Sequence, residues 1–132
     1  PQNAVRGPIV MVTNQWAGSD GDIVGAVTQA MGYAKVIGER SWGGVVGIDG
    51  RFDLVDGTGV TQPRYAGWYG DYGWGVENHG VDPDIVVTVS PEDWESASDV
   101  QLDAAIAECL RQLDEKSAAT PPELPGPAFG RC

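Results

Sequence analysis

The sequence predicts an α/β fold, in which short buried strands alternate with helices in layers. Residues 8–13 form a nearly continuous apolar run rich in β-branched side chains, which is typical of a strand buried on both faces. Residues 35–39 and 84–89 are further short candidate strands. Between the first two runs, apolar residues recur at helical spacing: Ile23, Val24, Val27, Ala30 and Met31. We therefore expect strand, helix and strand in succession.

The first strand and helix are joined by small residues with one serine at the joint. Ser19 follows Gly18 and precedes two acidic residues that fall in the first helical turn, where the helix dipole favours negative charge. One interpretation is a nucleophile, with the Asp20 amide stabilising an oxyanion, a contribution of about 3–4 kcal/mol per donor. The other is an ordinary helix N-cap, which the local pattern favours. Since Gly18 directly precedes the serine, whereas Gly21 comes two residues after it, the G-x-S-x-G elbow is not matched.

The middle of the chain predicts a hairpin followed by an irregular aromatic segment. Residues 45–48 and 51–55 flank Asp49-Gly50, a dipeptide that suits a two-residue type I′ turn. A glycine-rich turn at 40–44 precedes this hairpin. Residues 57–75 then combine many glycines with tyrosines and tryptophans. This segment either lines a substrate site or forms a packed loop or subunit contact, and the second interpretation is slightly favoured.

The last predicted element is a helix that starts near residue 98. Residues 98–101 (Ser-Asp-Val-Gln) fit a capping box, and the apolar residues that follow predict a core or interface stripe rather than a cofactor site. The stripe consists of Leu102, Ile106, Cys109, Leu110 and Leu113. From residue 117 onward the chain is rich in Ala and Pro, and we expect an extended or disordered tail there.

Composition limits the classes of function. A chain of 132 residues is one domain or a piece of one, and its formal charge of −11 argues against nucleic acid or an anionic membrane as partner. No apolar run spans a bilayer and no signal-peptide pattern is visible, so a cytoplasmic location is expected. Cys109 and Cys132 form neither a disulfide framework nor a metal motif, and predict a buried thiol and a loose end. Because the chain starts with Pro1 close to a core strand, we expect the C-terminal piece of a larger protein.

A serine nucleophile needs a base, and few residues here qualify. Lys35 and Lys116 are the only lysines, and His79 is the only histidine. A lone histidine in a turn is more often a surface or hydrogen-bonding residue than a catalytic base. Glu77, set among valines, glycines and aromatics, is expected to need a partner. That partner is either an imidazole that it orients or an arginine, Arg40 or Arg64.

Three blocks of sequence together resemble a known family. They are residues 17–23 (Ala-Gly-Ser-Asp-Gly-Asp-Ile), residues 37–45 (Ile-Gly-Glu-Arg-Ser-Trp-Gly-Gly-Val) and residues 76–85, which begin Val-Glu-Asn. In this order they resemble the C-terminal part of the tricorn core proteases, and more broadly the C-terminal processing peptidases. The similarity runs from about residue 7 to residue 113. It implies a crotonase-like catalytic domain, of which residues 1–116 are the C-terminal part and residues 117–132 the tail.

The resemblance also implies roles for individual residues. Ser19 matches the nucleophile, the Asp20 amide matches one of two oxyanion donors, and Glu77 matches the glutamate that orients a histidine through a second serine. The histidine, the second serine and the other donor would lie upstream, so the chain alone would be inactive. The position of Gly44 lacks the lysine of the processing peptidases, which favours the tricorn branch.

That branch implies a cytoplasmic homo-oligomer, a hexamer, that cleaves oligopeptides released by the proteasome and uses neither metal nor cofactor. The resemblance assigns no substrate-binding residue in this chain. The alternatives are a processing-type peptidase with a Ser-Lys dyad and a non-catalytic peptide-binding or assembly module of the same fold.

Overall fold

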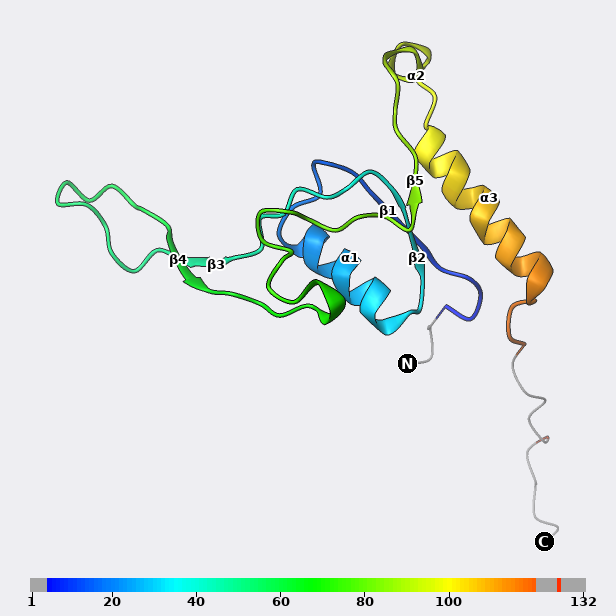
Figure 1. The fold of residues 1–132 in the computed structure, drawn as a ribbon, viewed down its shortest axis with the longest axis horizontal. Helices are drawn as coiled ribbons and strands as arrows, with labels where there is room; N and C mark the ends of the chain where they lie inside the picture. Colours follow the sequence, from blue (N-terminus) through cyan, green and yellow to red (C-terminus); the bar gives the residue numbers. More distant parts are fainter. Residues whose placement is uncertain (1–4, 121–125, 127–132) are drawn as a thin grey trace, which may run out of the picture.

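The computed structural model of the chain describes residues 5–120 and residue 126. Three parallel strands, in the order β1-β2-β5, lie between α1 on one side and α3 on the other (Figure 1). The predicted α/β class is therefore confirmed. In chain order the elements are β1 (Val10–Thr13), α1 (Asp20–Met31), β2 (Lys35–Gly38), β3 (Gly47–Asp49), β4 (Gln62–Tyr65), the 3-10 helix η1 (Gly70–Tyr72), β5 (Ile85–Val86), α2 (Pro91–Ser96) and α3 (Val100–Glu115).

The register of the sheet brings two loops to the same edge. Val10 pairs with Lys35 and Thr13 pairs with Gly38, so β1 and β2 end side by side. Gly38 has a φ of 126°, and a Cβ there would overlap the carbonyl of Thr13. The turn that carries Ser19 and the glycine-rich turn after β2 therefore start next to each other, at the edge where open α/β sheets commonly bind ligands.

The helix α1 packs on the chain with a face that shares only Ile23 with the stripe that its apolar pattern predicts. Its buried residues are Asp22, Gly25, Ala26 and Thr28. Val24, Val27 and Met31 of the predicted stripe are exposed, Met31 by 70%. The face with small residues is buried because it lets α1 lie close to the segment that carries Val81: a Cβ at Gly25 would lie 3.4 Å from Cγ1 of Val81. The core beneath α1 consists of Ala26, Val45, Val76 and Val81, with Ile23, Tyr69 and Tyr72 packed against it.

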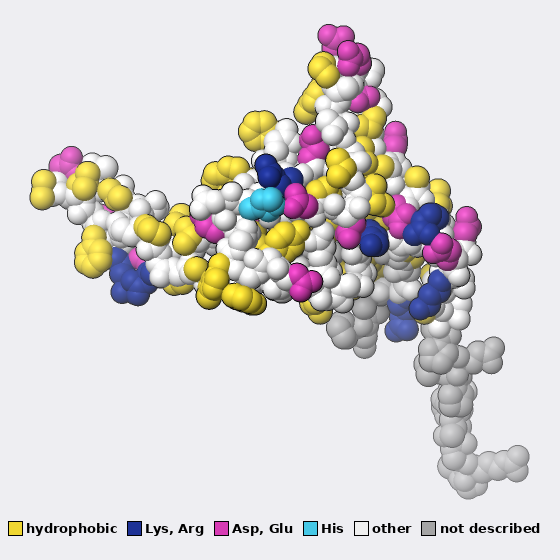
Figure 2. All heavy atoms as spheres, in the orientation of Figure 1, with side chains coloured by type: hydrophobic (Ala, Val, Ile, Leu, Met, Phe, Trp, Pro, Cys, Tyr) yellow, Lys and Arg dark blue, Asp and Glu magenta, His cyan; other side chains and the backbone are white. Residues whose placement is uncertain are grey.

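The predicted two-residue hairpin is wrong. β3 pairs antiparallel with β4, from which it is separated by the twelve residues 50–61, and residues 51–55 form no strand. Asp49 ends β3 and holds two arginines, Arg51 at 3.2 Å and Arg64 at 3.3 Å, which fix the base of a long connection instead of a tight turn. The result is an arm that projects from the body, with exposed hydrophobic side chains along it (Figures 1 and 2).

The strand predicted over residues 84–89 is shorter and more exposed than expected. Only Ile85 and Val86 form β5, and Val86 is 71% exposed. An additional short helix, α2, follows. It has a complete capping box between Ser90 and Asp93. The box expected at residues 98–101 is absent, and α3 is instead capped by Asp99, whose side chain accepts from the Leu102 amide at 2.9 Å.

The last helix turns polar and small residues toward the sheet. Gln101, Ala105 and Glu108 are its buried residues, while Leu102, Ile106, Leu110 and Leu113 are exposed. The predicted stripe is thus not part of the core that this chain forms. Cys109 is partly exposed rather than buried, and Cys132 lies outside the described residues.

The predicted tail starts beside the N-terminal segment, where the Ala119 amide donates to the Arg6 carbonyl at 3.1 Å. Most of the tail lies outside the described residues. Among the described helices, none is long and apolar enough to cross a membrane.

Candidate active site

Ser19 lies in a strained turn at the start of α1. Its φ of 53° and ψ of −109° fall outside the regions that residues with a Cβ normally occupy. The Gly21 amide donates to the Gly18 carbonyl at 2.9 Å, so residues 18–21 form a turn with Ser19 at the type II′ position that usually requires glycine. Strained strand-to-helix turns of this kind present the nucleophilic serine in α/β-hydrolases. Although Ser19 occupies the N-cap position, its side chain makes no capping hydrogen bond.

The backbone around Ser19 leaves an amide free for a ligand. Asp20 is the first residue of α1, and within the described residues its N–H donates to no acceptor. The turn is packed closely from the other side by Trp42, whose amide donates to the Ala17 carbonyl at 2.9 Å. A Cβ at Gly18 would lie 2.6 Å from Cε3 of that indole. The close packing of Trp42 on this turn therefore requires a glycine at position 18.

Glu77 is held by backbone amides rather than by an arginine. Its Oε2 accepts from the amides of Val45 and Val46, both at 2.7 Å. Arg64 pairs with Asp49 instead, and no ion pair joins Glu77 to Arg40 within residues 5–120. Hydrogen bonds of this kind to an acidic side chain are stronger than neutral ones and fix the carboxyl group in place. Glu77 therefore anchors the segment that follows the glycine-rich turn.

A cavity of about 390 Å³ connects these features. Ser19 and Asp20 form one side of it, and the segment anchored by Glu77 forms another. Its lining residues are Ser19, Asp20, Ile23, Val45, Val46, Gly47, Ile48, Tyr65, Ala66, Gly67 and Tyr69. Most of these are apolar, and a peptide side chain fits a concave apolar site with a few polar groups at its edge.

The aromatic segment divides between the two interpretations that its sequence allows. Tyr65 and Tyr69 line the cavity beside Ser19. Trp68 and Trp74 pack against each other instead, with ring centroids 5.4 Å apart and planes at 87°. Tyr72 bonds to Gln29 at 3.0 Å, and partial burial raises the pKa of its hydroxyl. The segment therefore lines the cavity with two of its tyrosines and packs on itself and on α1 with other aromatic side chains.

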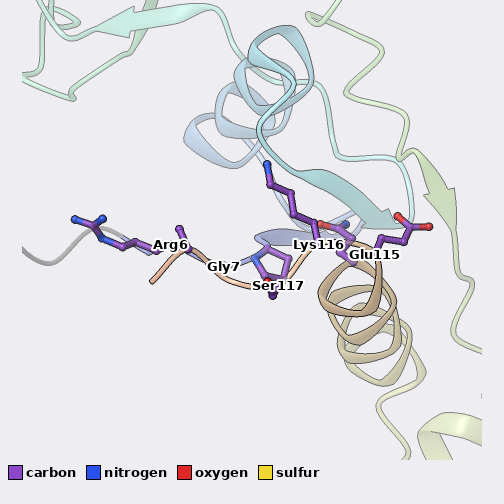
Figure 3. Close-up of a pocket in the computed structure, with 8 residues that line it drawn as sticks. Arg6, Gly7, Glu115, Lys116 and Ser117 are labelled. Carbon is purple, nitrogen blue, oxygen red and sulfur yellow. The ribbon is translucent and has the colours of Figure 1, made fainter. Parts of the chain in front are cut away.

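None of the three candidate bases lines the cavity beside Ser19. His79 pairs with Asp82, with Nε2 2.7 Å from Oδ2, on the exposed surface. Lys35 lies at the start of β2, at the opposite end from the Ser19 edge, and its Nζ is 3.4 Å from Asp84. Lys116 lines a different hollow, between the end of α3 and the segment that leads into β1 (Figure 3).

Asp22 is a buried residue of this region whose position in the first turn of α1 predicts only a favourable interaction with the helix dipole. Its carboxyl group is fully buried and accepts three hydrogen bonds from the glycine-rich turn, from Ser41, Gly43 and Gly44. An acidic residue three positions after an N-cap more often turns back to the N-cap amide. Its position in the first turn would therefore predict a bond to the N-cap amide, whereas the actual partners lie in the glycine-rich turn. Residues 5–120 contain no cluster of His, Cys, Asp or Glu that could hold a metal ion.

Comparison with known proteins gives concordant results. The model of peptidase family S41 matches residues 1–87. Tricorn protease homolog 1 of Streptomyces coelicolor is 58% identical over 125 residues, which cover 95% of this chain and 12% of that protein. The tricorn protease of Thermoplasma acidophilum is 50% identical over 113 residues, or 86% of this chain and 11% of that protein. The chain thus spans only a small fraction of the length of these relatives.

Solved structures agree with the sequence comparison. The crystal structure of the tricorn protease superposes with a TM-score of 0.82 at 49% identity, covering 86% of this chain and 11% of that one. Mature CPAF matches with a TM-score of 0.66 at 20% identity, covering 86% of this chain and 22% of that one, which shows a shared fold.

Proposed function

This chain belongs to peptidase family S41, and from that premise we propose that it is the C-terminal, nucleophile-bearing part of a tricorn-type serine peptidase. The observation that carries the proposal is the strained Ser19 turn, with its free Asp20 amide, at the edge of a cavity that fits a peptide side chain. The same resemblance supports a crotonase-like domain over residues 1–116.

The reaction that suits this arrangement is acyl transfer. The Ser19 Oγ attacks the scissile carbonyl carbon while a base takes its proton, and the Asp20 N–H stabilises the negative charge on the carbonyl oxygen. The C–N bond then breaks, the amine leaves with the proton from the base, and water hydrolyses the acyl-enzyme by the same steps. The base is a histidine supplied from outside this chain, so these 132 residues alone are inactive.

Glu77 acts on that histidine indirectly, through the hydroxyl of a second serine. Its Oε2 accepts from two amides, and within the described residues its Oε1 has no hydrogen-bond partner. One carboxylate oxygen is therefore fixed and the other is available to accept from a hydroxyl group. A Ser-Lys dyad is less favoured, because neither Lys35 nor Lys116 lines the cavity beside Ser19.

The substrate is an oligopeptide whose apolar side chain next to the scissile bond enters the cavity. Ile23, Val45 and Tyr69 supply apolar surface there. By resemblance to the tricorn branch, the protein acts in the cytoplasm as a homo-oligomer, a hexamer, on peptides released by the proteasome.

The proposal is tested in the intact protein that contains this chain. Replacing Ser19 with Ala should abolish labelling by a fluorophosphonate and reduce peptide hydrolysis by at least about a thousandfold. Ser96→Ala, on the exposed helix α2, is the matched control and should change neither. Hydrolysis at the parental rate by Ser19→Ala would show that the nucleophile is wrong. Absence of both labelling and hydrolysis in the parental protein would instead favour a non-catalytic module.

A further inference from the structure

We propose that Asp22 is a positioning residue for the Ser19 reaction: its buried carboxyl group ties the first turn of α1 to the glycine-rich segment 41–44 and so sets the nucleophile relative to Glu77. This inference rests on the proposed peptidase function, because it concerns the geometry of the same site. Asp22 does not line the cavity and does not touch substrate.

The carboxyl group of Asp22 is fully bonded although no solvent reaches it. Its Oδ1 accepts from the Ser41 hydroxyl at 2.5 Å and from the Gly43 amide at 2.8 Å, and its Oδ2 accepts from the Gly44 amide at 3.2 Å. The Ser41 oxygen in turn accepts from the Val81 amide at 2.8 Å. A satisfied buried polar network of this kind holds its members in one arrangement, because each broken bond leaves a buried donor or acceptor unpaired.

At one end, the network holds the turn that presents the nucleophile. Asp22 lies three residues after Ser19, in the same first turn of α1. The backbone conformation of Ser19 is worth about 1–3 kcal/mol of strain, and such a conformation persists only when the surrounding structure determines it. The Ser19 hydroxyl makes no capping bond that would do so. The backbone bonds from Gly21 to Gly18 and from Trp42 to Ala17 hold the turn itself, and the side-chain bonds of Asp22 add a buried restraint from the neighbouring loop.

At the other end, the network leads directly to Glu77. Gly44, which donates to Asp22, is followed by the two residues whose amides donate to the Glu77 carboxyl group, Val45 and Val46. Glu77 and Asp22 therefore hold adjacent parts of one segment. The carboxyl groups of Asp22 and Glu77, together with the backbone of residues 44–46 between them, therefore set the distance from Ser19 to Glu77.

A displacement in this linkage should affect the chemical step more than substrate binding. A misplacement of about 1 Å at the reacting atoms can reduce a rate about a hundredfold. The apolar lining of the cavity does not include Asp22, so peptide affinity should change little.

The test uses the intact protein and compares Asp22→Asn, Ser41→Ala and the double variant. We expect Asp22→Asn to lower kcat and the fluorophosphonate labelling rate by between about ten- and a hundredfold, with KM changed less than about threefold. Ser41→Ala should lower kcat less. The double variant should be no slower than Asp22→Asn alone, because both remove the same linkage.

Glu108→Gln is the matched control, since Glu108 is a buried acidic residue of α3 whose partners are Arg111 and Gln112. It should leave kcat unchanged in protein that is fully folded by circular dichroism. Equal kcat values for Asp22→Asn and parental protein would overturn the inference, as would a loss that only follows the folded fraction. If Asp22→Asn does not fold, Ser41→Ala decides, and an unchanged kcat there refutes the linkage. Activity retained by Ser19→Ala would refute the proposed function instead.

Discussion

Substituting Ser19 with glycine rather than alanine should reveal the strain in the nucleophile turn. Both variants lose the hydroxyl group, so they differ only in the Cβ that alanine retains at φ 53° and ψ −109°. Relief of the strain should favour glycine by about 1–3 kcal/mol. The greater freedom of glycine in the unfolded chain removes about 0.5–1 kcal/mol of this gain. We therefore expect Ser19→Gly to be more stable than Ser19→Ala by about 1 kcal/mol.

The difference is measurable by urea unfolding of the two variants, followed by circular dichroism, with the midpoint compared at equal slope. Ala107 provides the internal control, because it is exposed in the middle of α3. There, replacement by glycine should destabilise the chain by about 1 kcal/mol. The preference between alanine and glycine should thus reverse between the two positions. If Ser19→Gly is equal to or less stable than Ser19→Ala, the turn is not strained and the argument built on it fails.

Two further predictions concern the scaffold around the site. Gly43→Ala should lower the free energy of unfolding, measured in urea, by about 3 kcal/mol or more, since φ is 90° and a Cβ would overlap the backbone of Gly80. Gly57→Ala is the control: φ is 83° but the space around it is open, so the free energy of unfolding should fall by only about 1 kcal/mol. Arg111 lowers the pKa of Glu108 to about 2, so the stability from this pair is present above the ordinary pKa of 4.5 and lost as pH falls toward 2. Unfolding measured from pH 6 to pH 2 should therefore show a steeper loss of stability in parental protein than in Glu108→Gln, and parallel curves would contradict the role of the pair.

Local signals were sufficient for several elements and misleading for others. The strand, turn and helix from residue 10 to residue 31 were predicted because the residues that specify them are neighbours in sequence. The prediction of an Asp49-Gly50 hairpin was wrong because β3 pairs with β4, and Asp49 forms ion pairs with Arg51 and with the more distant Arg64. The dipeptide indicates only a local turn preference, and the pairing of β3 with β4 outweighs that preference.

The apolar stripes of α1 and α3 show the same limit. Periodicity identified both helices, but each packs on this chain through small or polar residues such as Gly25 and Gln101. Which face is buried depends on the distance of approach and on hydrogen bonds to other segments, such as that from Gln101 to the Val87 carbonyl at 2.9 Å. The apolar pattern of one helix gives information neither on the distance of approach nor on these hydrogen bonds.

For the candidate site, the sequence by itself determined the family, the position of Ser19 at the start of a helix and the presence of an acidic residue at 77. These depend on motifs that are contiguous in the chain. Only the tertiary structure decided that Ser19 is strained and uncapped, that Glu77 binds the amides of Val45 and Val46, and that Asp22 joins the two. The physical reason is that the hydrogen-bond partners of these two carboxyl groups lie about 20–30 residues away, on loops that meet only when the parallel sheet aligns its strand ends.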